Sequence, residues 1–139
     1  MMDVHAAIAW SRERLKPGGF LVMNDYVGPS RFQYDENTLT MCNTILADFN
    51  MPPACRPDAK VVEKSDPTEA ADSGRIKDAL FRYFPDALWI PTGGILYFIG
   101  FCFKEVDWTP DALMKMIELD ARLNAAGNYV YAFAVAKRT

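Results

Sequence analysis

Apolar positions recur along the chain in patterns that alternate between helix and strand. Apolar residues at helical spacing predict a first helix from Asp3, its cap, to about Leu15. Pro17-Gly18-Gly19 ends that helix and turns the chain into a strand over 20–26. The first four residues of this strand are all apolar, which indicates burial on both faces and is typical of an interior, parallel strand.

The same reasoning predicts the remaining elements. They are a helix from about Asp35 or Glu36 to Phe49, a third helix from about Gly74 to Phe84, a short strand over 87–90, a long helix over 109–126 and a last strand over 129–136. Four prolines between 50 and 73 predict a long loop, which is often functional, with at most one short turn at Asp66-Pro67. The apolar segment 95–106 fits either a strand or a buried helix.

Composition narrows the class of protein. A length of 139 residues, half of them hydrophobic, fits one folded domain. With a net charge of −3 and no basic cluster, we expect no nucleic-acid partner. The longest apolar run is too short to span a bilayer, so we expect no membrane association. Three cysteines without C-x-x-C spacing favour reduced thiols and a cytoplasmic location, and a single histidine argues against a metal site.

Two motifs carry a family resemblance. Leu15-Lys16-Pro17-Gly18-Gly19 is similar to the turn before the fifth strand of class I S-adenosylmethionine-dependent methyltransferases, and the segment from Asn24 to Gln33 resembles a subgroup with a helical insertion after that strand. The resemblance covers nearly the whole chain. It implies an α/β, partial Rossmann-like fold: a small mixed three-stranded sheet in the order fifth, seventh, sixth, with about five helices. Residues 1–139 would form a single domain with an insertion at about 28–85, and 95–106 would be helical.

The sequence departs from the family at its start. Methyltransferases hold the methyl donor with a G-x-G-x-G loop after their first strand, and no glycine or apolar strand precedes Gly18. We therefore expect no cofactor-binding residue, no catalytic residue and no cofactor in this chain, with S-adenosylmethionine bound only if a partner supplies the other half. Without that half, one edge of the 20–26 strand is bare. This predicts a homodimer, or a partner that covers the edge.

Six polar residues are candidates for a substrate pocket. Ligands of open α/β sheets bind beyond the carboxyl ends of the strands, and three candidates end the 20–26 strand while two others follow it. The sixth, Asp120, falls inside the apolar stripe of its helix, with Asn124 one turn later. The set is Asn24, Asp25, Tyr26, Arg31, Gln33 and Asp120. Alternatively, Asp25 pairs with Arg31, and Asp120 bonds to the backbone.

Three functions follow as hypotheses. The first is a stand-alone methyltransferase-like C-terminal domain, inactive alone, that acts in binding or assembly as an oligomer. The second is a subunit or truncated fragment of an S-adenosylmethionine-dependent methyltransferase. The third is a non-enzymatic binder that keeps a small-molecule pocket under the insertion.

Overall fold

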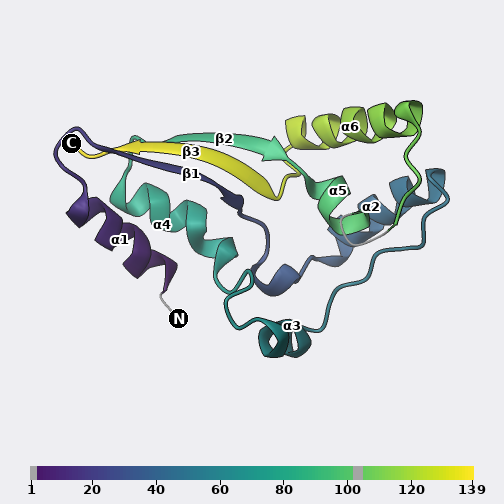
Figure 1. Cartoon of the computed structure of the whole chain (residues 1–139), viewed down its shortest axis with the longest axis horizontal. Helices are drawn as coiled ribbons and strands as arrows, with labels where there is room; N and C mark the ends of the chain where they lie inside the picture. The colour runs from purple at the N-terminus through teal and green to yellow at the C-terminus, as the bar shows by residue number, and fades with distance from the viewer. Residues whose placement is uncertain (1–2, 102–104) are drawn as a thin grey trace.

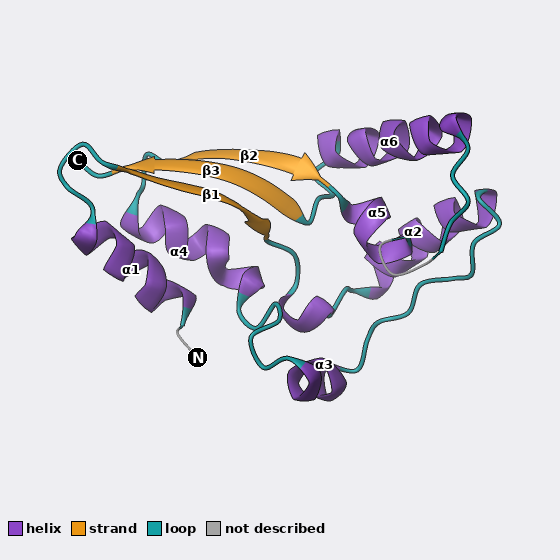
Figure 2. Ribbon diagram, viewed as in Figure 1, coloured by secondary structure: helices purple, strands orange, loops and turns teal. Residues whose placement is uncertain are grey.

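The computed structural model describes residues 3–101 and 105–139. Within them the chain forms six α-helices, two 3-10 helices and three strands (Figures 1 and 2). In chain order these are α1 (Val4–Arg14), β1 (Phe20–Tyr26), η1 (Ser30–Phe32), α2 (Glu36–Asp48), α3 (Ala59–Ser65), η2 (Ser73–Arg75), α4 (Ile76–Tyr83), β2 (Leu88–Gly93), α5 (Ile95–Gly100), α6 (Pro110–Ala125) and β3 (Tyr131–Lys137).

The three strands form one sheet in the order β1-β3-β2, so the last strand lies in the centre, as predicted. In the register, Val22 of β1 and Leu88 of β2 both lie opposite Val135. Both neighbouring pairs are antiparallel, so the prediction of a mixed sheet is wrong. The strands β1 and β2 run in the same direction, but β3 separates them.

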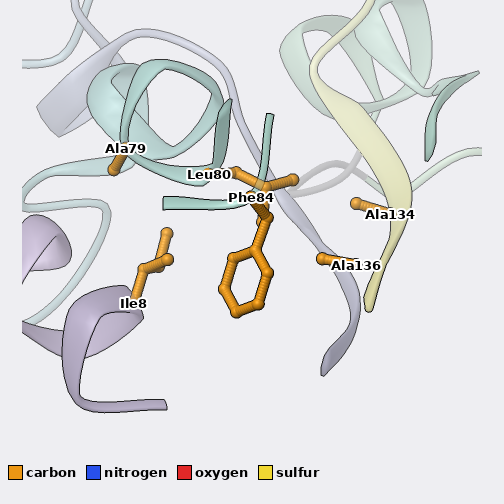
Figure 3. Packing of buried hydrophobic residues seen from close by; sticks show 6 residues of the cluster. All are labelled: Ile8, Ala79, Leu80, Phe84, Ala134 and Ala136. Carbon is orange, nitrogen blue, oxygen red and sulfur yellow. The ribbon is translucent and has the colours of Figure 1, made fainter. Parts of the chain in front are cut away.

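One face of the sheet is covered by α1 and α4 (Figure 1). The central strand presents the small side chains of its alanines to this face. Figure 3 shows Leu80 of α4 and Phe84, the residue that follows α4, packed against them, with Ile8 of α1 beside Phe84. The buried members of this core are Ile8, Ala79, Leu80, Phe84, Ala134 and Ala136.

No helix of the described residues covers the middle of the opposite face, which we call the open face. Its outer strands leave large apolar side chains in water: Phe20 is 57% exposed, Val22 58%, Leu88 54% and Ile90 43%. The prediction that β1 is buried on both faces is therefore wrong. The apolar run in β1 places alternate side chains on opposite faces, and only Leu21 and Met23 pack against the helical core.

A second group of helices lies beyond the carboxyl end of β1 (Figure 2). Here α2, α5 and α6 enclose a core of Leu46, Leu96, Phe101 and Met116. The expected helix after Gly93-Gly94 is confirmed as α5, although it ends at Gly100 and residues 105–106 are not helical. Cys102, Phe103 and Lys104 lie outside the described residues.

The segment 50–73 holds one element that the proline pattern did not predict. Helix α3 begins after Asp58, whose carboxylate accepts a hydrogen bond from the backbone N–H of Lys60 at 2.8 Å. Its seven residues fit between Pro57 and Pro67, so the prolines limit the helix to two turns instead of excluding it. With α3, the described helices number six instead of about five.

Candidate functional site

A cleft of about 670 Å³ lies at the carboxyl end of β1. Such a volume is typical of small-molecule sites. Three segments that are distant in sequence meet there: the first turn of α1, the end of β1 and the chain around η2. The lining residues are Asp3, Val4, Ala7, Asp25, Tyr26, the run 68–73, Arg75 and Ile76.

The three candidates at the end of β1 do not share one environment. Asp25 is exposed and lines the cleft, where its Oδ1 accepts the backbone N–H of Tyr26 at 2.7 Å. Asn24 lies one residue earlier, so its side chain is on the open face, in register with Phe133. Adjacency in the sequence therefore places Asn24 and Asp25 on opposite sides of the sheet.

Tyr26 joins the cleft to an aromatic cluster. Its hydroxyl donates to the carbonyl of Pro29 at 3.1 Å and lies 3.0 Å from the hydroxyl of Tyr34. Its ring centroid is 5.1 Å from that of Phe98 and 5.8 Å from that of Tyr131. Burial raises the pKa of Tyr26 to about 12, because a buried phenolate loses its hydration. The phenol is therefore neutral at pH 7 and unsuited to act as a general base.

Arg31 holds the loop that forms one wall of the cleft, whereas Gln33 bonds to the chain before α3. The guanidinium of Arg31 donates to the carbonyls of Asp66, Pro67 and Glu69 at 2.8–3.1 Å. Gln33 donates to the carbonyls of Arg31 and Pro57 at 2.9 Å each. The alternative in which Arg31 pairs with Asp25 is wrong, since its side chain is committed to these carbonyls.

Asp120 lies away from the cleft, on α6. Its two oxygens accept the backbone N–H groups of Gly94 at 2.6 Å and Leu96 at 2.8 Å, at the start of α5. Asn124 donates to the carbonyl of Pro91 at 3.2 Å. These are the backbone bonds that the sequence offered as the alternative to a pocket. Both side chains also line a smaller hollow of about 250 Å³ with Thr92, Tyr97 and Ile117.

Sequence reasoning did not place the other polar groups of the cleft. Arg75 lies 3.2 Å from Asp3 and 3.3 Å from Asp72. Hydrogen bonding from the N–H of His5 lowers the pKa of Asp3, whose carboxylate also caps α1. Buried Ser73 donates to the carbonyl of Gly28 at 2.9 Å. Asp72, Ser73 and Arg75 are close in the sequence, but they meet Asp3 and Gly28 only through tertiary packing, which no local pattern could reveal.

Asp25 is the carboxylate of the cleft that sequence reasoning found and that the structure leaves open to a ligand. No ion pair to Asp25 or Glu69 is present among the described residues. Over the same residues, no group of three or more His, Cys, Asp or Glu side chains is arranged to hold a metal ion.

None of the described helices combines the length and apolar character needed to cross a bilayer. No protein-family model, curated protein or solved structure matches the chain.

Proposed function

We propose that this chain is a methyltransferase-like C-terminal unit that acts in binding and assembly through its open face, without methyl-transfer activity of its own. The observation that carries the proposal is the apolar, uncovered middle of that face. Globular domains normally bury such side chains, and a large exposed apolar patch marks a surface that meets another molecule.

The exposed area is large enough to matter energetically. Aromatic side chains present about 150–250 Å² each, and aliphatic ones fall at or below the lower end of that range. Since Phe20, Val22, Leu88 and Ile90 are about half exposed, together they leave roughly 400 Å² in water. Covering that area contributes about 10 kcal/mol at 25 cal/mol per Å². This is comparable with the whole stability of a domain, about 5–15 kcal/mol.

The methyltransferase relationship is supported by topology. The resemblance implies a last strand that lies between the other two, and β3 has this position. It also implies a helix directly after Gly93-Gly94, where α5 is found.

Protection of the open face from a labelling reagent tests the assembly role. We expect hydroxyl radicals to modify Phe20 and Leu88 several-fold more slowly than the equally exposed Trp10 and Val61, which lie on α1 and α3. Modification of all four at rates that follow their exposure and reactivity, in purified protein and in cell extract, would refute the proposal.

Calorimetry with S-adenosylmethionine tests the absence of a donor site. We expect no heat of binding from the isolated chain. Micromolar binding would instead favour a genuine methyltransferase subunit or fragment.

The cleft at Asp25 favours a second candidate function, a small-molecule binder. Asp25 supplies a hydrogen-bond acceptor there, beside the apolar side chains of Val4, Ala7 and Ile76. A short alkyl alcohol or amine has matching chemistry, and saturation-transfer NMR with a panel of both classes tests the idea. Ala71→Trp fills the cleft and should abolish binding, whereas Val61→Trp should not. If no compound of the panel gives a signal, the cleft does not bind short alkyl alcohols or amines.

A further inference from the structure

We infer that the open face is covered by a second copy of this chain, packed sheet against sheet about a twofold axis. The inference rests on the proposed function, because it names the partner of the same surface. Four observations support it: the composition of the face, its extent, the position of its one charge and the way in which its strands are exposed.

The side chains of the open face are almost entirely apolar. Its central rows are Val22–Val135–Leu88 and Asn24–Phe133–Ile90, read across the sheet. Tyr26 and Tyr131 also belong to this face, at the end where they pack on Phe98. The other polar side chains that the described strands add to it are Asn24, Thr92 and Lys137. A charged ligand or an acidic peptide could pair with only one cation on this face, Lys137. A second apolar face could instead pack against the apolar side chains along its whole length.

The surface of the open face continues from the sheet onto two helices, which add further exposed apolar side chains to it. Thr92 of β2 lines the smaller hollow together with Tyr97 of α5 and Ile117 of α6, so the three are neighbours. Tyr97 is 45% exposed, Ile117 47% and Leu113, one helical turn away, 39%. Adding these side chains and the half-buried Phe133 and Val135 brings the apolar area toward the roughly 800 Å² that each partner of a standard interface buries.

The position of Lys137 favours a twofold axis. Lys137 lies at one end of the face, with its Nζ 5.8 Å from the centre of the Phe20 ring. In a twofold pair with antiparallel β3 strands, the two lysines lie at opposite ends of the interface and do not repel each other. A twofold interface also joins the same patch to itself, so no second protein is needed.

Packing of faces accounts for the exposed side chains better than pairing of edges. A strand added beside β1 would satisfy backbone groups along that edge, as the bare edge predicted from the sequence requires. It would leave Leu88 and Ile90, on the far strand β2, in water. Two sheets stacked about 10 Å apart bury the side chains of all three strands.

Sedimentation velocity with matched variants tests the inference. At micromolar concentration, we expect the sedimenting species to have twice the 15.7 kDa mass of the native chain. Val22→Glu and Leu88→Lys each place an unpaired charge in the interface and should weaken the dimer about 100-fold or more. The control Val61→Glu introduces the same charge at a position 64% exposed on α3 and should remain dimeric. Circular dichroism checks that each variant folds.

Three outcomes overturn the inference. A native dimer that both open-face variants leave intact would mean that the copies meet through another surface. A native monomer whose Phe20 and Leu88 become protected in cell extract would mean that a different protein covers the face; the second copy is then wrong and the assembly function stands. A native monomer labelled at these residues in every condition would refute both.

Discussion

At the scale of single residues, Asp120 fixes the junction between β2 and α5. Its carboxylate accepts two backbone N–H groups at the start of α5, where an uncapped helix would leave donors unsatisfied. Gly93 makes room for it: this residue has φ +88°, and a Cβ there would lie 2.6 Å from Asp120 Oδ2.

Gly93→Ala should destabilise the protein more than Gly127→Ala. Both glycines have φ +88°, so the backbone strain of an alanine is matched, but a Cβ at Gly127 meets no described atom within 4 Å. The difference between the two variants isolates the clash with Asp120, which we expect to cost about 1–3 kcal/mol in urea unfolding. Equal losses would show that the Asp120 contact is unimportant.

Tyr26 should make stability fall at alkaline pH. Its pKa is about 12 in the folded chain and about 10 when unfolded. Between these values the unfolded chain has released the proton that the folded chain keeps, so stability is complete below pH 10 and falls as pH rises toward 12. We expect a loss of about 2 kcal/mol. Urea unfolding across this range checks it.

The control for this prediction is Tyr26→Phe. Without the Tyr26 hydroxyl, the loss of stability between pH 10 and 12 should be smaller by about 2 kcal/mol. Tyr34, whose pKa is also raised by burial, still contributes to the remaining loss. Identical slopes for the native and variant chains would contradict the assignment.

What the sequence could predict about the site depended on the range of the interactions. Asp120 stood out because a carboxylate in an apolar stripe needs partners, and the backbone bonds offered as one alternative are present. Arg31 and Gln33 were assigned to a substrate pocket because they follow β1. Their actual acceptors lie at 57 and 66–69 in the chain, and nothing in the local pattern connects these distant segments.

At the scale of elements, the caps made the helices predictable. Asp3, Asp35 and Thr109 each accept a backbone N–H in the first turn of their helices, and all three helices begin where the sequence predicted. The burial of β1 was predicted wrongly because a run of four apolar residues fits a strand buried on two faces as well as one exposed on an uncovered face. Only the tertiary structure distinguishes them.

Arg31→Lys should loosen the loop between α3 and η2. A lysine cannot donate to three carbonyls arranged around a planar guanidinium. We expect a glutamate-specific protease to cut after Glu69 several-fold faster, with little change in the thermal midpoint. Arg12→Lys, at an exposed position on α1, serves as the control. Unchanged cleavage would show that other contacts hold the loop.

At the scale of the whole molecule, the sheet has one protected and one unprotected side. Helices α1 and α4 cover the first, and the end of the second meets α5, where Phe98 packs on Tyr26 and Tyr131. In the proposed dimer, the second copy covers the middle of the open face. Stability should therefore depend on protein concentration, which an isolated domain would not show.

Thermal unfolding at several concentrations measures this dependence. For a dimer of this size, each tenfold dilution should lower the midpoint by roughly 2 °C. The midpoint of Val22→Glu should not move with dilution. A constant midpoint for the native chain over a hundredfold range would contradict the coupling of folding to assembly.

The central place of β3 also sets an order of events during synthesis. Both β1 and β2 pair only with β3 in the described sheet, and Phe20 finds its partner at Lys137. Until residues 131–137 have left the ribosome, β1 and β2 lack the strand with which they pair. Until that release, the apolar side chains of Phe20 to Met23 lack their native partner strand, and the nascent chain is exposed to aggregation. A premature stop codon before Tyr131 would yield a product without a sheet.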